Sequence, residues 1–115
     1  MVRNRSGYLQ MAYDRLQSKI TKGNLWLYIL KLLWDKTMYA YAINKKIKET
    51  FRFTTATVTV YVVLYKMRRE GLIKMIGEKQ VHNKRIRKYY EITEKGRENF
   101  LQGIELLKST IKFLE

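Results

Sequence analysis

The sequence predicts an α+β fold that is mostly helical, with one two-stranded β-hairpin and a long helix at its C-terminal end. Apolar residues recur at helical spacing through most of the chain, and this spacing gives way to alternation after Gly71. A regular apolar seam then returns near the C-terminus. At 115 residues, 46% of them hydrophobic, the chain is long enough for one domain with its own core and small for an enzyme.

The charge of the chain is strongly positive and unevenly distributed. The formal net charge is +14, and residues from Thr93 onward hold four bases and four acids, so the whole excess precedes Thr93. Such an excess indicates a polyanionic partner, with nucleic acid first and an anionic membrane surface second. The longest apolar run, 25–33, contains Lys31 and falls far short of the roughly 20 residues that span a bilayer, which disfavours a membrane.

Residues that could perform catalysis or bind a metal are sparse. There is no cysteine, which excludes disulfides and thiolate metal sites, and the glycines are too isolated for a phosphate loop. The single histidine, His82, is better suited to a phosphate contact or plain exposure than to general-base work. We therefore expect no enzyme, no cofactor and no metal. No secretion signal is recognised, and we expect a cytoplasmic, nucleoid-associated protein.

Two helices are predicted before residue 36. Leu9, Tyr13, Leu16 and Ile20 are spaced 4, 3 and 4 and predict a first helix that closes near residues 22–23. Asn24 is a candidate N-cap for a second helix over 25–35, which is apolar nearly all round and should be buried on most sides. Its Trp26 and Trp34 are better explained as core or interface residues than as a ligand box.

A third helix is predicted over 38–50, after a turn at 35–37. Thr37 is its candidate N-cap. The predicted inner face is apolar and the outer face is rich in lysine: Ala40, Ile43 and Ile47 lie inside, and Lys45, Lys46 and Lys48 lie largely outside.

The stretch 54–73 is predicted to form the helix around which the chain is organised. Val60, Leu64 and Met67 form an apolar stripe, and Gly71 ends the helix. The opposite face holds hydroxyl and basic residues: Thr57, Tyr61, Tyr65 and Arg68. Alternating valines at 58, 60 and 62 also fit a strand, and an ordinary amphipathic helix with a solvated basic face would show the same pattern. We favour a recognition helix, because an apolar back and a hydroxyl-rich, basic front suit the major groove of DNA.

Residues 72–92 are predicted to form a hairpin. Leu72 to Ile76 and Ile86 to Ile92 read as strands, and 77–85 reads as a polar loop between them. Five bases and no acid lie between Lys79 and Lys88. A basic hairpin directly after a recognition helix predicts a winged helix-turn-helix, whose wing lies along phosphates or enters the minor groove. A solvated hairpin tip is the alternative.

The last helix is predicted to begin after Thr93, a candidate cap, with Glu94 at the positive end of its dipole. Its apolar residues are spaced 4, 3, 4 and 3 as in a coiled coil: Phe100, Ile104, Leu107, Ile111 and Leu114. A seam that runs past the hairpin needs a partner, and a second copy of the chain is the economical choice. We expect residues 1–93 to form the DNA-binding region and 94–115 the dimerisation helix, within one compact domain.

Several motifs together resemble the PadR-type winged-helix transcriptional regulators. The match includes Tyr61-x-x-Leu64-x-x-Met67-x-x-Glu70-Gly71-Leu72-Ile73 and Arg87-Lys88-Tyr89-Tyr90-x-Ile92-Thr93-x-x-Gly96. Upstream, Lys22-Gly23-Asn24-Leu25 and Tyr39-Ala40-Tyr41-Ala42-Ile43 are also similar. The chain departs from that family at Ala40 and at Ala56-Thr57-Val58-Thr59. The resemblance implies a DNA-binding repressor that is dimeric through its terminal helices. Some relatives bind aromatic effectors between subunits, which Trp26 and Trp34 would allow.

The predicted function is sequence-specific binding of double-stranded DNA by a homodimer that regulates transcription. Base edges are assigned to Thr55, Thr57, Tyr61 and Arg68, phosphates or the minor groove to Lys79, Lys84, Arg85 and Arg87, and backbone contacts to Arg52 and Lys45. The dimer interface is assigned to Leu9, Tyr13 and Leu16 together with Phe100, Ile104, Leu107, Ile111 and Leu114. The alternatives are a non-specific architectural nucleic-acid-binding protein and a ligand-sensing dimer that binds planar aromatics.

Overall fold

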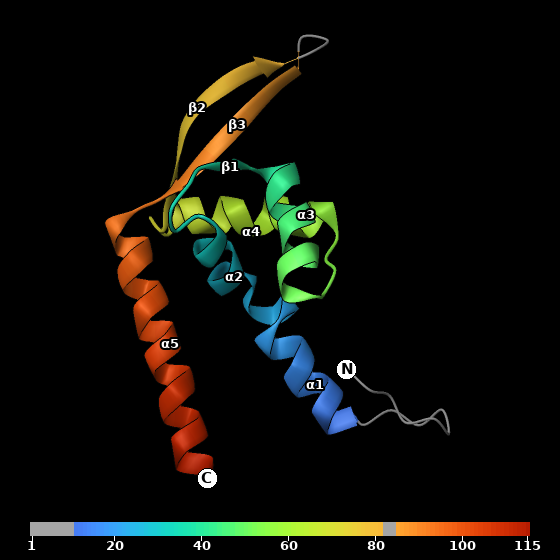
Figure 1. The fold of residues 1–115 in the computed structure, drawn as a ribbon, viewed down its shortest axis with the longest axis vertical. Coiled ribbons are helices and arrows are strands. Elements are labelled where there is room, and N and C mark those ends of the chain that lie inside the picture. The colour runs from blue at the N-terminus through green and yellow to red at the C-terminus, as the bar shows by residue number, and fades with distance from the viewer. Residues whose placement is uncertain (1–10, 82–84) are drawn as a thin grey trace.

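A computed structural model describes residues 11–81 and 85–115 and confirms a mostly helical α+β fold (Figure 1). In chain order the elements are α1 (Met11–Ile20), a 3-10 turn η1 (Lys22–Asn24), α2 (Leu25–Leu32), β1 (Met38–Tyr39), α3 (Ala40–Phe51), α4 (Thr57–Arg69), β2 (Ile73–Val81), β3 (Arg85–Ile92) and α5 (Glu94–Leu114). The three strands form one antiparallel sheet in the order β1-β3-β2. The β2–β3 hairpin projects from the central helices, and α5 runs away from its base toward the opposite end.

The core lies where α2, α3 and α4 meet beneath the sheet. Each helix buries residues three or four positions apart, as the sequence pattern predicts, since that spacing places them on one face. The fully buried side chains include Leu25 and Ile29 from α2, Ile43 and Ile47 from α3, and Val60, Leu64 and Met67 from α4. The competing strand interpretation of 57–62 is therefore wrong, because one helical face of α4 is needed to complete this core.

The start of α3 differs from the prediction. Met38 and Tyr39 pair with Tyr90 and Tyr89 as the short strand β1, so α3 begins at Ala40 and its N-cap residue is Tyr39 instead of Thr37. The N-cap makes no side-chain hydrogen bond to the first turn. Pairing with β3 provides backbone hydrogen bonds for these two residues in the sheet. A capping pattern uses only residues close in sequence and therefore could not predict this long-range contact.

The second helix is also shorter than predicted, since α2 ends at Leu32. Asn24 occupies the N-cap position, but its side chain does not cap the helix. Its Nδ2 donates to the Lys19 carbonyl at 2.6 Å, and its Oδ1 accepts from Trp26 Nε1 at 3.2 Å. These bonds tie the end of α1 to the start of α2.

The end of α4 is fixed by a Schellman motif around Gly71. The Gly71 N–H donates to the Arg68 carbonyl at 3.0 Å, and the Leu72 N–H donates to the Met67 carbonyl at 2.9 Å. Gly71 has φ of +80°, a left-handed conformation that glycine adopts without steric cost. This confirms the predicted helix stop and turns the chain directly into β2.

The hairpin strands are longer than predicted. Most of the expected polar loop at 77–85 belongs to β2 and β3, which pair as far as Val81 and Arg85 with a bulge between Met75 and Gly77. Polar residues can extend a two-stranded ribbon because the ladder bonds come from the backbone and opposite charges can face each other. Lys74 Nζ on β2 lies 3.5 Å from Glu91 Oε2 on β3.

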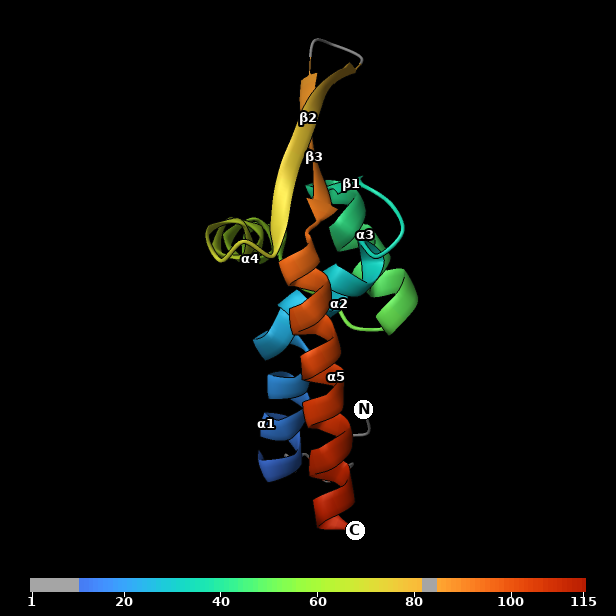
Figure 2. The same ribbon diagram turned by 90° about the vertical axis from the view of Figure 1, so that its left-hand side faces the viewer.

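The last helix is fastened to the base of the hairpin, and its predicted cap is confirmed. The Thr93 hydroxyl accepts from the Gly96 N–H at 3.0 Å and donates to the Gly71 carbonyl at 2.6 Å. Beyond Phe100 the helix leaves the core, and Figure 2 shows its length relative to the central helices. Among residues 11–81 and 85–115, no helix combines the length and hydrophobicity required to cross a membrane.

Candidate nucleic-acid interface

The exposed face of α4 presents hydroxyl, aromatic and basic side chains to solvent. Tyr61, Tyr65 and Arg68 are exposed, and the Arg69 guanidinium lies 5.8 Å from the centre of the Tyr65 ring. The same helix also exposes two aliphatic residues, Val58 at 72% and Val62 at 53%. These valines were not among the predicted site residues. Their high exposure at the solvent side of a packed helix is the signal that distinguishes them from the buried Val60.

Thr57 is exposed at the start of α4, and its hydroxyl is already engaged within the chain. Asn44 Nδ2 on α3 donates to Thr57 Oγ1 at 3.0 Å. The Thr57 O–H remains free to donate elsewhere, because a hydroxyl can accept and donate at once. Asn44 therefore fixes the start of α4 against α3, a role that its sequence position did not reveal.

The link between α3 and α4 places two of the predicted backbone-contacting residues together. Arg52 has φ of +68°, and its N–H donates to the Lys48 carbonyl at 3.2 Å, which ends α3. Lys45, Lys48, Glu49 and Arg52 line one shallow depression. Thr55, also assigned to the interface, is half-buried in the same link. Glu49 adds a carboxylate to this basic surface, although Lys46 Nζ lies 3.6 Å from Glu49 Oε1 and offsets part of its charge.

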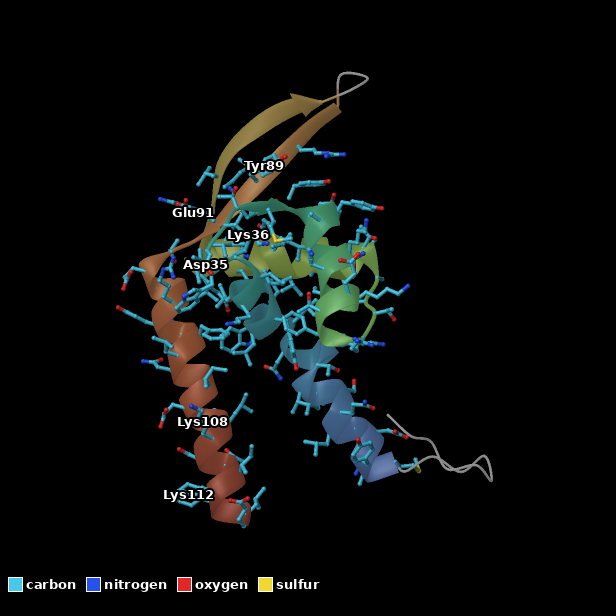
Figure 3. The ribbon with its side chains drawn as sticks, viewed as in Figure 1. Asp35, Lys36, Tyr89, Glu91, Lys108 and Lys112 are labelled. Atoms are coloured by element: carbon cyan, nitrogen blue, oxygen red, sulfur yellow. The ribbon has the colours of Figure 1, made fainter. Side chains whose placement is uncertain are left out.

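The base of the wing contains an aromatic cluster that holds Arg87. The Arg87 guanidinium carbon lies 4.2 Å from the centre of the Tyr39 ring. Tyr39 stacks with Tyr41 at 6.4 Å and meets Tyr89 edge-on at 5.5 Å. Figure 3 labels Tyr89 on β3, just above β1. Arg87 is therefore held by cation–π contact against the sheet instead of extending freely into solvent.

The other predicted wing residues are only partly described. Lys79 lies in β2 opposite Arg87, and Arg85 is the first residue of β3. Lys84 and His82 lie outside the described residues.

A pocket of about 250 Å³ lies between α4 and the base of the wing. It is lined by Tyr39, Ala40, Tyr61, Arg87, Lys88 and Tyr90. Burial raises the pKa of Tyr90 above its ordinary value, an effect that Arg68 opposes and Tyr61 adds to. The Tyr90 hydroxyl therefore stays protonated and able to donate at neutral pH. The pocket combines two cations with three phenol side chains from three separate elements.

The opposite end of the molecule carries apolar surface. Of the residues assigned to the dimer interface, Tyr13, Leu16, Leu107, Ile111 and Leu114 are exposed in the single chain, while Phe100 and Ile104 are half-buried. Leu9 lies outside the described residues. A cleft of about 790 Å³ between the end of α1, α2 and α5 is lined by Ile20, Trp26, Leu27, Phe100, Leu107, Ile111 and neighbouring residues. Trp34 is placed elsewhere, between Phe100 at 5.2 Å and the Arg97 guanidinium at 4.7 Å.

Several solved structures have a fold similar to that of this chain. A transcriptional regulator from Clostridium thermocellum is 26% identical, with 84% of this chain and 92% of that chain covered and a TM-score of 0.72. A PadR-like transcriptional regulator from Bacillus cereus is 30% identical over 85% of this chain and 95% of that chain, with a TM-score of 0.63. Bacillus subtilis PadR, solved in complex with operator DNA, is 24% identical over 70% of this chain and 47% of that chain, with a TM-score of 0.64. A comparison with curated proteins found no match.

The sequence itself also matches a family description. The model of the transcriptional regulator PadR-like family matches residues 29–102, a range that extends from α2 through the wing to the first turns of α5. With the winged-helix fold described above, this match confirms the resemblance drawn from the sequence motifs. The chain belongs to the PadR-like family of transcriptional regulators.

Proposed function

We propose that this chain is a homodimeric repressor that binds double-stranded DNA in a sequence-specific manner. The observation that supports this most strongly is the pairing of two surfaces: the hydroxyl-rich, basic face of α4 and the basic hairpin beside it. A helix fits the major groove, and a hairpin beside it can follow the flanking backbone. A further support is that Bacillus subtilis PadR, of similar fold, has been solved in complex with operator DNA.

The proposed roles follow the chemistry of each surface. Thr55, Thr57, Tyr61 and Arg68 approach base edges, and the exposed Val58 and Val62 contact apolar base edges such as the thymine methyl group. Arg52 and Lys45 contact the sugar-phosphate backbone. The wing residues Lys79, Lys84, Arg85 and Arg87 contact phosphates or enter the adjacent minor groove.

Dimerisation is proposed from the exposed apolar faces of α1 and α5. Leu114 is 83% exposed and Leu107 41% exposed in the single chain, although both belong to a coiled-coil seam. A contiguous apolar surface of this kind is typical of a protein–protein interface. We propose that a second copy covers it, so that 94–115 serves as the dimerisation helix of a cytoplasmic, nucleoid-associated regulator and 1–93 as its DNA-binding region.

The wing assignment is tested by replacing Lys84, Arg85 and Arg87 together with Ala. Affinity for every duplex should fall, and the slope of log K against log salt should become shallower by about 0.9 for each lost phosphate contact. Lys112→Gln, a change of charge near the far end of α5 (Figure 3), is the control and should leave the slope unchanged. An unchanged slope in the triple variant would falsify the wing assignment.

A second candidate function is the sensing of planar aromatic ligands. The observation that favours it is the apolar cleft that Trp26 lines together with Phe100 and Leu107. Planar aromatic compounds should then quench the fluorescence of Trp26 in a saturable manner. Because Trp34 packs outside this cleft, a Trp34→Phe variant would isolate the Trp26 signal, and the absence of quenching in that variant would exclude this function.

A further inference from the structure

The pocket between α4 and the wing has the chemistry of an anion site. Its lining includes the Arg87 guanidinium and the Lys88 ammonium group, with no carboxylate among the lining residues. Tyr39, Tyr61 and Tyr90 contribute phenol groups, which can donate hydrogen bonds. Ala40, at the first turn of α3, also lines it, so the positive end of that helix dipole adds to the same field.

Tyr90 is placed to donate a hydrogen bond into this pocket. Tyr90 is only 7% exposed, yet it lines the pocket, and its hydroxyl has no hydrogen bond to another residue in the described part of the chain. The hydroxyl itself is not among the buried unpaired atoms of the described residues, so it remains accessible and can donate to a group in the pocket.

One of the two cations in the pocket, Arg87, is held in position before any ligand binds. Arg87 lies over the Tyr39 ring, and Tyr39 is itself fixed between Tyr41 and Tyr89. A side chain that is already ordered loses less conformational entropy on binding than a free surface arginine. A guanidinium is also suited to phosphate, because its planar donors match two phosphate oxygens.

We propose that this pocket binds one phosphodiester group of the DNA backbone, at the edge of the groove that α4 enters. The inference rests on the proposed function. If α4 lies in the major groove and the hairpin lies outside it, the strand that borders the groove passes between them, where the pocket is. Arg87 and Lys88 then neutralise the phosphate, while Tyr90 donates a hydrogen bond to it. The contact fixes the position of α4 relative to the bases without reading sequence.

Three variants separate the charge from the hydrogen bond. Measured on a short random-sequence duplex over about 50–200 mM salt, Arg87→Gln should lower the log–log slope by about 0.9, whereas Arg87→Lys should keep it. Tyr90→Phe keeps the buried ring and should weaken affinity about ten-fold with no change of slope, since it removes a neutral donor to a charged group. Lys112→Gln, away from the pocket, should change neither quantity.

The decisive measurement replaces single phosphates of the duplex with neutral methylphosphonates, one position at a time. At one position in each half-site, the loss of affinity seen with the wild-type chain should be clearly smaller in Arg87→Gln, because both changes remove the Arg87 contact while those of Lys88 and Tyr90 remain. If the affinity losses caused by the methylphosphonate and by Arg87→Gln are additive at every position, the pocket assignment is overturned while the proposed function stands. An unchanged salt slope in Arg87→Gln would overturn it in the same way. Failure of the wild-type chain to bind any duplex would instead overturn the proposed function.

Inorganic phosphate distinguishes the two sources of this ligand chemistry. Added at constant ionic strength, it should leave duplex affinity unchanged, because the pocket is completed by the groove edge of DNA. Competition by inorganic phosphate that disappears in Arg87→Gln would reassign the pocket to a free phosphate compound.

Discussion

Gly96 is a residue at which the fold has no room for a side chain. A Cβ added there would lie 2.2 Å from the Leu72 carbonyl oxygen and 2.9 Å from Ile92 Cγ1. The Leu72 carbonyl cannot move away easily, because it also accepts from the Thr93 N–H at 3.0 Å. Close approach of the backbones therefore explains, in physical terms, why glycine follows Thr93 at this spacing in the motif shared with the family.

Gly96→Ala should destabilise the chain by about 2 kcal/mol or more, since the clash is with backbone and the site is tightly packed. In thermal unfolding this corresponds to a fall in Tm of about 10 °C. Gly77→Ala is the matched control, because a Cβ there has nothing within 4 Å. Equal Tm values for the two variants would contradict the tight packing of α5 against the start of β2 and the end of β3.

At the scale of elements, the packing of α4 determines the orientation of its exposed face and the point at which the wing hairpin begins. Its buried stripe of Val60, Leu64 and Met67 fixes the helix against α2 and α3, and the Schellman motif at Gly71 fixes where the hairpin begins. The exposed side chains of α4 are consequently held in a fixed orientation relative to the core and the hairpin. Its contribution to DNA binding should be discrimination between sequences, because base edges, unlike phosphates, differ among sites.

Tyr61→Ala and Thr57→Ala should each lower the preference for a selected DNA site over altered sites by roughly 1–3 kcal/mol for each base contact removed. Thr57→Ala also removes the acceptor for Asn44, so its folding should be verified by thermal unfolding. Thr110→Ala is the control, since that exposed threonine lies on α5 and bonds only locally to the Leu106 carbonyl. If both variants lose affinity equally for all sequences, α4 makes backbone contacts only.

Much of this architecture could be predicted from local pattern. The apolar stripe of α4, its stop at Gly71 and the Thr93 cap depend on residues close in sequence, and all three were predicted correctly. Strand β1 and the extended wing could not be predicted, because they depend on pairing with β3 from a distant part of the chain. For the same reason Tyr39 and Tyr90 were missed at the candidate interface, since only the folded sheet brings them together.

At the scale of the whole molecule, basic and apolar surfaces lie at opposite ends. The wing projects from one side of the central helices and the free length of α5 from the other (Figure 1). The surfaces proposed for DNA binding and for dimerisation therefore do not overlap. Two copies joined through α5 would present two recognition helices, which a single chain cannot do.

Leu107→Asp tests this arrangement. It would place an unpaired charge in the seam between Ile104 and Ile111, which costs several kcal/mol if a partner helix covers it. The variant should sediment as a monomer, with affinity for a selected site reduced to that for random DNA. Lys112→Gln changes the net charge by the same amount and should remain dimeric. A folded Leu107→Asp dimer with full affinity would place the interface elsewhere.

The measurement that most directly tests the central proposal is selection of bound sequences from a random pool of duplex DNA by the wild-type chain. We expect an inverted repeat whose half-sites are centred about 34 Å apart, one turn of B-DNA, or a multiple of that distance. Competition with unrelated duplex should then show a preference of roughly 10³-fold or more. Recovery of no common sequence, with equal affinity for all duplexes, would contradict the proposal and favour a non-specific architectural protein.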